Sequence, residues 1–408
     1  MYVVLNSSIQ ISEFERPQPE STSEATKFLI QCGDLNYVVS TPVKILVETL
    51  LTSQKLNIPL DKSYQRFSQN KASPEEIMAL ANKHIPSTLF SGAEVPARKT
   101  PFILSINLLP ERILSYAALP LALLFNKWLA FGLVSVFIAI HIWLFPAISQ
   151  SAITGIPTGD IPIFIASMLL SYFIHELGHI SACRRFNCPH GDIGVGIYFI
   201  FPVFFADVSK AWRLNRIERA TVDLGGLYFQ AILLIAIDYY AFANQSSLAY
   251  LLSWTITFTM LHTLNPFFKF DGYWLLSDLS GITNLHEKMA KALQAVKNKL
   301  LHQTPIDIQN NKTLLLLIPY SLLTIAFFLY VASFLLKKLI QTTAEIASML
   351  KELPVSGFLS AAEYIFYQGE IWVFIKGVVW IALIFTLLVF YTKRIATLIY
   401  PKAQATGK

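Results

Sequence analysis

A stretch of 24 residues at 313–336, TLLLLIPYSLLTIAFFLYVASFLL, contains no charged side chain. About 20 apolar residues in a helix cross the roughly 30 Å hydrocarbon core of a bilayer, so this stretch predicts a transmembrane helix. The composition agrees, because 54% of the 408 residues are hydrophobic and only 14% are charged, whereas soluble domains carry about 25% charged residues. The chain is therefore expected to be a polytopic α-helical membrane protein.

Six stretches in all are long and apolar enough to span a membrane. They are 128–147, 161–183, 222–242, 248–268, 313–336 and 371–392. The third is the weakest of the six because it is interrupted by small and polar residues, namely Gly225, Gly226, Gln230 and Asp238. We therefore expect about six transmembrane helices.

The distribution of Lys and Arg sets the expected orientation. Segments 184–221 and 269–312 are rich in both residues, whereas 148–160 and 243–247 contain neither. Because basic loops stay in the cytoplasm, six spans place both termini there, in what we expect to be the cytoplasmic membrane of a bacterium. The net charge of +6 follows from this topology, and no nucleic-acid partner is expected.

The first hundred residues differ from the rest in having the composition of a soluble domain. The chain starts without the basic and apolar segments of a secretory signal, so we expect this domain in the cytoplasm. Alternating apolar residues predict strands, and helical patterns follow at 41–54, 60–69 and 74–85. Strands followed by three short helices favour a winged-helix-like α+β domain. The expected organisation is a cytosolic peptide-recognition-like domain at 1–100, a linker and interfacial segment at 101–127, a catalytic membrane core at 128–280, and an amphiphilic loop with C-terminal transmembrane helices at 281–408.

Within the second predicted span, His175, Glu176 and His179 form the pattern H-E-x-x-H. Residues i and i+4 share one face of a helix, so both imidazoles can bind one Zn²⁺. Glu176 is rotated by about 100° from His175 and is placed to take a proton from metal-bound water. The alternative is a helix with two satisfied core histidines, but ionisable groups inside a membrane are expensive and usually functional.

A catalytic zinc usually has three protein ligands, and Asp271 is the predicted third. The second span ends near Arg184, which places His179 about 7–8 Å below the cytoplasmic boundary. The fourth span runs in the same direction and delivers Asn265, Pro266 and Asp271 to the same end. Pro266 interrupts helical hydrogen bonding, which is tolerated at depth where backbone lines a polar cavity.

These motifs together resemble the site-2 protease family of intramembrane zinc metalloproteases, in which a membrane-embedded H-E-x-x-H helix is paired with a distant N-P-x-x-x-x-D-G element. The matching residues are His175, Glu176, His179, Asn265, Pro266, Asp271 and Gly272. The segment 224–230, which includes Gly225, Gly226 and Gln230, is similar to the family's intervening motif, although glutamine replaces the usual asparagine. The resemblance covers about 125–280. It implies one catalytic Zn²⁺ held by His175, His179 and Asp271, with Glu176 as the general base. The cleft residues that it implies are Asn265, Pro266, Gly225, Gly226 and Gln230.

The segment 193–206, IGVGIYFIFPVFFA, is predicted to form a hairpin beside the zinc site. Its edge offers an extended substrate a strand to pair with. Asp207 follows directly and is either an extra polar group of the cleft or, with greater weight, a residue that caps the loop. Cys183, Cys188 and His190 form an alternative metal set, but their spacing is loose and favours plain buried thiols. With Cys32 as the third cysteine, no disulfide framework is expected.

The branch that the chain looks closest to is the peptide-maturation, or peptide zinc metalloprotease, group. The resemblance implies cleavage of a small precursor or membrane-associated peptide, with residues 1–88 similar to domains that bind a leader peptide by strand addition. A structural or regulatory role for that domain is the alternative. Two other functions stay open, namely regulated cleavage of a membrane-anchored signalling protein, and a peptide transporter or immunity protein with a structural zinc. A fourth protein ligand, such as His262 or Asp207, would favour the last of these.

Overall fold

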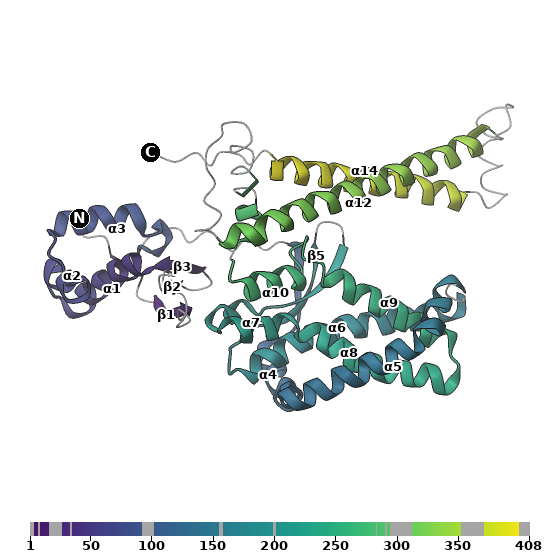
Figure 1. Cartoon of the computed structure of the whole chain (residues 1–408), viewed down its shortest axis with the longest axis horizontal. Coiled ribbons are helices and arrows are strands. Elements are labelled where there is room, and N and C mark those ends of the chain that lie inside the picture. Colours follow the sequence, from purple (N-terminus) through teal and green to yellow (C-terminus); the bar gives the residue numbers. More distant parts are fainter. Residues whose placement is uncertain are drawn as a thin grey trace. The chain divides into compact units, whose positions relative to one another are not determined.

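The computed structural model describes residues 4–6, 9–15, 27–32, 35–91, 102–154, 158–198, 201–282, 284–289, 292–293, 312–351 and 371–399. The chain divides into two compact units, Met1–Gly281 and Ile282–Lys408 (Figure 1). The predicted metal ligands all lie in the first unit.

The N-terminal part of the first unit has three strands followed by three helices. These elements are β1 (Gln10–Glu15), β2 (Lys27–Cys32), β3 (Leu35–Ser40), α1 (Thr41–Leu56), α2 (Leu60–Ser68) and α3 (Pro74–His84). The three helices lie within two residues of their predicted bounds. The helix α3 starts where predicted because Ser73 and Glu76 cap each other's backbone N–H groups. The antiparallel sheet has the order β1-β2-β3, so β3 is an edge strand.

Four helices of the first unit lie side by side: α5 (Lys127–Thr154), α6 (Ile161–Arg185), α8 (Gly225–Asn244) and α9 (Ser247–Thr263) (Figure 1). The first three are long and apolar enough to cross a membrane. Their outward faces are apolar, as for Trp128 and Phe131, which are 74% and 71% exposed. The helix α9 has 17 residues and is shorter than a typical span of about 20.

The third predicted span, 222–242, starts too early. The chain first forms the separate helix α7 (Arg216–Asp223), and α8 begins at Gly225. The residue between them, Leu224, ends the first helix while its own backbone stays in the right-handed helical region. The Val222 backbone consequently lies at a junction between two helices, where its carbonyl can turn to a partner outside the α8 ladder.

The second unit contributes α12 (Lys312–Lys351) and α14 (Ile371–Ile399), which pack against each other. Within α12, Leu314–Glu345 is long and apolar enough to span a membrane, and Gly377–Val389 of α14 is a shorter apolar stretch. The described residues thus hold four helices that meet the length and hydropathy of a membrane span. The total of six spans remains a prediction.

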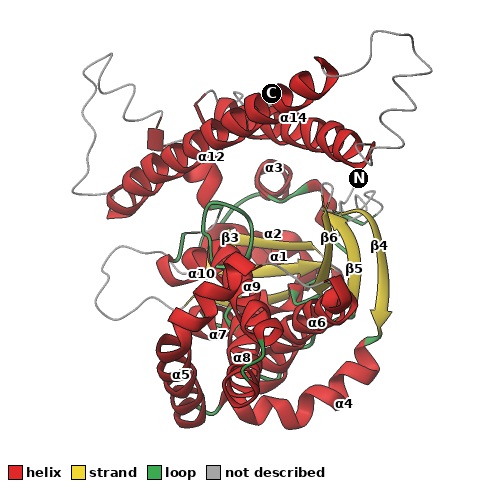
Figure 2. Cartoon of the chain, turned by 90° about the vertical axis from the view of Figure 1, so that its right-hand side faces the viewer, coloured by secondary structure: helices red, strands yellow, loops and turns green. Residues whose placement is uncertain are grey.

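The predicted hairpin at 193–206 is present as β5 (Ile193–Tyr198) and β6 (Phe201–Ala206). A third strand, β4 (Phe102–Leu109), pairs with β5 and gives the sheet order β4-β5-β6 (Figure 2). The helix α4 (Glu111–Leu121) follows β4. Asp192 joins the two segments, because its carboxylate accepts hydrogen bonds from the Asn107 side chain and the Glu111 backbone at 2.8 and 2.7 Å. Segment 102–121 is thus part of the sheet and its neighbouring helix.

Candidate metal centre

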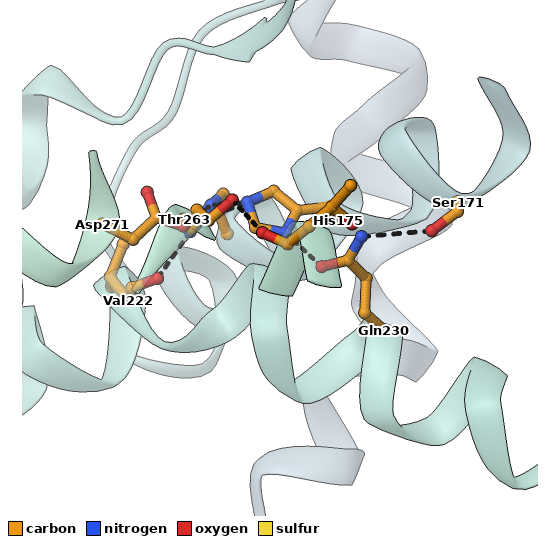
Figure 3. Close-up of polar contacts among 8 residues, drawn as sticks. Ser171, His175, Val222, Gln230, Thr263 and Asp271 are labelled. Carbon is orange, nitrogen blue, oxygen red and sulfur yellow. Dashed lines mark hydrogen bonds and ion pairs between the residues drawn. The ribbon is translucent and has the colours of Figure 1, made fainter. Parts of the chain in front are cut away.

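The three predicted ligands converge in the structure (Figure 3). His175 and His179 are one turn apart on α6, and Asp271 is the first residue of α10 (Asp271–Ser280). The Nε2 atoms of the two histidines are 3.1 Å apart. Oδ2 of Asp271 lies 3.0 Å from Nε2 of His175 and 3.4 Å from Nε2 of His179. We call these three residues the metal cluster.

The partners of the other imidazole nitrogens fix which atoms face the centre. Nδ1 of His179 donates to the carbonyl of Val222 at 2.7 Å, and a carbonyl can only accept. Nδ1 of His175 lies 3.0 Å from Oε1 of Gln230, whose amide nitrogen donates to the hydroxyl of Ser171 (Figure 3). Both Nδ1 atoms therefore carry the proton of a neutral imidazole, and both Nε2 lone pairs point inward.

This donor set fits Zn²⁺. Two nitrogen ligands about 2.0–2.1 Å from a tetrahedral zinc lie about 3.3 Å from each other, and the three separations in the metal cluster are close to that value. Oδ2 of Asp271 is also buried without a hydrogen-bond donor among the described residues. Three acceptors that face one another without a donor are suited to a cation. Among the described residues, the group has these three members, and three protein ligands are the number that a catalytic zinc usually has.

Glu176 lies beside the metal cluster and not within it. Its carboxylate accepts a hydrogen bond from the backbone N–H of Ala206, the last residue of β6. This contact places the predicted base between the metal cluster and the edge strand of the sheet. The geometry matches the predicted role of Glu176, which is to act on a group near the metal instead of binding the metal itself.

Glycines allow α6 and α8 to cross at contact distance. A Cβ atom on Gly178 would lie 2.2 Å from the carbonyl oxygen of Gly225, and one on Gly226 would lie 2.5 Å from the His175 ring. Gly178 therefore lets the two helices pack closely, and Gly226 leaves room for the imidazole of His175. The two predicted cleft residues Gly225 and Gly226 lie under the metal cluster as part of the α6–α8 contact.

The turn between α9 and α10 delivers Asp271. Oδ1 of Asn265 accepts from the backbone N–H of Phe267 at 2.9 Å, which closes an Asx-type turn at the Asn-Pro step. A Cβ on Gly272 would lie 1.9 Å from the carbonyl oxygen of Leu264. Only glycine fits there, so Asn265, Pro266 and Gly272 shape the loop that carries the ligand.

The carboxylate of Asp271 needs positive charge beside it to stay ionised in its buried position. Burial raises its pKa, whereas positive charge at His179 and His175 lowers the pKa of Asp271 below its ordinary value. With both imidazoles neutral, a bound cation would supply that charge, and an ionised carboxylate is the form that binds a metal.

Two other predicted groups do not join the metal cluster. Oδ1 of Asp207 accepts from the backbone of Ser209 at 3.1 Å, which agrees with a loop cap. Cys183 and Cys188 are buried against each other at the end of α6, where Asn187 has a φ of 52° and the Cys188 N–H donates to the Cys183 carbonyl at 2.9 Å. Such a helix end brings these two positions into apolar contact. No metal set that includes them is found among the described residues.

Several supporting residues were not predicted from the sequence. Ser171 and the Val222 carbonyl fix the orientation of the histidines. Arg219 and Asp278 form a buried ion pair at 2.8 Å between α7 and α10. Beside them, burial and the neighbouring Asp278 carboxylate raise the pKa of Asp223 to about 8. The sequence shows that 216–223 and 271–280 contain charged residues. It does not show that Arg219 pairs with Asp278, because that pairing depends on a contact between helices far apart in sequence.

No protein-family model matches the chain, and no solved structure matches it. A curated relative is the Bacillus subtilis (strain 168) protein named "Putative peptide zinc metalloprotease protein YydH", which is 28% identical over 119 residues. The likeness is to a zinc metalloprotease. The match covers 28% of this chain and 46% of the relative, so the chain spans about half the length of the curated relative.

Proposed function

We propose that this chain is a zinc-dependent intramembrane endopeptidase of the site-2 protease type that cleaves a small precursor or membrane-associated peptide. The observation that carries the proposal is the metal cluster itself, with three inward-facing acceptors and Glu176 beside it on a helix that is long and apolar enough to span a membrane. A bound zinc would polarise the scissile carbonyl and make water acidic enough to lose a proton near neutral pH.

The chain's own residues would supply the acid–base chemistry and the positioning. Glu176 would accept the proton of the attacking water and return it to the departing amine. Gln230 and the Val222 carbonyl would hold the two imidazoles in the orientation in which Nε2 faces the reacting groups. We place the enzyme in the cytoplasmic membrane of a bacterium, with both termini in the cytoplasm.

We place the substrate along the free edge of β6. The backbone N–H of Asp207 donates to the carbonyl of Asp192, which directly precedes β5, at 3.0 Å. In the pairing of β5 with β6, Phe205 lies opposite Gly194. Because hydrogen-bonding direction alternates along an antiparallel strand, the N–H of Phe204 points to the outer edge of β6, where Pro202 has no N–H and that of Ala206 is bonded to Glu176. A substrate strand added there would run past Glu176, which contacts Ala206.

A proline substitution in β6 tests this placement of the substrate more cleanly than one in β5. Ile197 lies in the central strand β5, so proline at that position would damage the sheet as well as any substrate contact. In Phe204→Pro the outward N–H is lost, and Phe204→Ala is the matched control that keeps it. Cleavage should fall in the proline variant alone, with zinc content unchanged in both. Equal cleavage by the two variants would remove β6 as the substrate strand.

For the N-terminal domain we propose binding of a leader peptide by strand addition. The support is its fold, three strands followed by three helices, in which β3 is an edge strand with Val38 39% exposed. A Val38→Pro substitution in the full chain should weaken the binding of a labelled precursor without changing cleavage of a leaderless peptide. If both activities fall together, the domain is structural.

The decisive experiment is Glu176→Gln in the purified full chain. Loss of the base should lower cleavage of labelled casein and of quenched-fluorescent hydrophobic peptides by about 10²–10⁴-fold, while zinc, measured by atomic absorption, stays at one ion per chain. Activity equal to that of the wild type would refute the assignment. Peptides retained by this variant in cells would then distinguish a secreted-peptide precursor from a membrane-anchored signalling protein.

A further inference from the structure

A hollow of about 450 Å³ lies between α4 and the end of α6, away from the metal cluster. Its lining consists of Glu111, Arg112, Ser115, Tyr116, Leu119 and Arg184. All but Arg184 come from α4, and Arg184 is in the last turn of α6. Because α6 is long and apolar enough to cross the membrane, its basic end marks the level of the lipid headgroups.

The two arginines of this hollow are exposed. In the part of the chain that the structure describes, neither the Arg112 nor the Arg184 guanidinium has a hydrogen-bond or ion-pair partner. Two guanidinium groups against the single carboxylate of Glu111 leave the lining with a net positive charge. Guanidinium groups bind phosphate oxygens in a fork geometry, so the hollow is suited to a phosphate-bearing ligand.

The rest of the lining becomes apolar along α4. Arg112, Tyr116 and Leu119 are spaced by four and three residues and therefore lie on one face of the helix. Tyr116 and Leu119 are 73% and 55% exposed. The opposite face of α4 is buried against α6 through Leu114 and Ala118. A charged end followed by an exposed apolar stripe has the polarity of a lipid, with the headgroup at one end and a chain at the other.

We infer that this hollow binds one anionic phospholipid of the surrounding leaflet, with its phosphate between Arg112 and Arg184 and its glycerol and acyl region along Tyr116 and Leu119. The apolar stripe favours a lipid over free phosphate, which would use only the arginines. It is also continuous in sequence with the lipid-facing surface of α5, which begins with Lys127 and the exposed Trp128.

The test is lipid retention by the full chain, reconstituted in nanodiscs of equal phosphatidylglycerol and phosphatidylcholine and then examined by native mass spectrometry. The wild type should retain one phosphatidylglycerol in preference to phosphatidylcholine. Arg112→Gln and Arg184→Gln should each weaken that retention roughly fivefold, which corresponds to about 1 kcal/mol per guanidinium near a membrane surface. Arg185→Gln is the matched control, because it removes the same charge at the neighbouring position outside the lining and should retain the lipid.

Zinc content in the same samples reports whether each variant is folded, and the lipid preference of the wild type tests the inference without any variant. Equal retention of the two lipids by the wild type would overturn it. Unchanged phosphatidylglycerol retention in the Arg112→Gln/Arg184→Gln double variant would do the same. Displacement of the lipid by inorganic phosphate at equal concentration would show an anion site that does not recognise lipid.

Discussion

Two of the clusters of ionisable groups in the helices of the first unit differ in how far their own hydrogen bonds satisfy them. One is the metal cluster of His175, His179 and Asp271. The other, which we call the His141 cluster, consists of His141, Asp238, Ser253 and Thr257, from α5, α8 and α9. Both contain histidine and aspartate, and both are costly to place in a membrane. Residue types alone would therefore make both of them candidate sites.

The His141 cluster is satisfied by its own members. Asp238 accepts from the Ser253 hydroxyl at 2.5 Å and lies 2.8 Å from Nδ1 of His141. Thr257 donates its single hydroxyl proton to the Ser253 carbonyl at 2.8 Å, so it accepts from Nε2 of His141 at 3.1 Å. One proton between His141 and Asp238 leaves the pair with no net charge, whichever atom carries it.

The metal cluster shows the opposite balance, because three acceptors meet there without a donor. The satisfied network joins three helices and needs no ligand, whereas the unsatisfied one is suited to an ion. Counting donors and acceptors thus separates a structural polar cluster from a functional one where burial and residue type do not.

The largest expected difference between the clusters concerns zinc. Asp271→Ala should abolish stoichiometric zinc binding, since loss of a group that only orients a ligand already costs about 10–100-fold in metal affinity. Competition with a chromophoric chelator measures this. Asp207→Asn is the control, because that side chain caps Ser209 outside the metal cluster. Tight zinc binding by Asp271→Ala would mean that a different group is the third ligand.

The converse substitution is Asp238→Leu in the His141 cluster. It leaves a buried imidazole without its charge partner, which should lower the free energy of unfolding by about 3–5 kcal/mol. Unfolding in mixed micelles measures the change, and zinc content should stay the same. His141→Leu/Asp238→Leu should recover much of the loss. A loss of zinc in folded Asp238→Leu would show that the clusters are coupled.

Gln230 lies on the same helix as Asp238 but contacts Nδ1 of the metal ligand His175. Its substitution should therefore affect zinc affinity less than that of Asp271, and stability less than that of Asp238. In Gln230→Leu, zinc affinity should fall by about 10–100-fold, with little change in unfolding of the zinc-free protein. Gln230→Glu is the control, since a carboxylate also accepts from Nδ1. If Gln230→Leu binds zinc as tightly as the wild type, the Nδ1 contact does not set the orientation of His175.

The sequence predicted the parts of this arrangement that depend on local pattern. The H-E-x-x-H spacing requires only that 161–183 be helical, and the hairpin at 193–206 follows from strand-forming residues around a short turn. Asp271 was found because the Asn-Pro step and Gly272 mark an irregular loop at a predictable depth. Gln230 was singled out as a cleft residue, but its contact with His175 depends on how closely α6 and α8 approach.

The parts that were missed depend on contacts between distant segments. Phe102–Leu109 reads as a linker until it pairs with β5, where Phe102 lies opposite Tyr198. Val222 acts through its backbone carbonyl, which no side chain reveals. Asp238 was visible only as a polar residue in a weak span, because its partner His141 lies 97 positions away.

The smallest predicted effect tests whether the His141 cluster is as self-contained as its hydrogen bonds indicate. Thr257→Val removes the acceptor for Nε2 of His141 and should lower the free energy of unfolding by about 0.6 kcal/mol, because side-chain hydrogen bonds within membranes are worth little when the unfolded state also finds partners. Thr257→Ser keeps the hydroxyl and should match the wild type. A loss of several kcal/mol in Thr257→Val alone would mean that the remaining members of the His141 cluster do not satisfy one another without this contact.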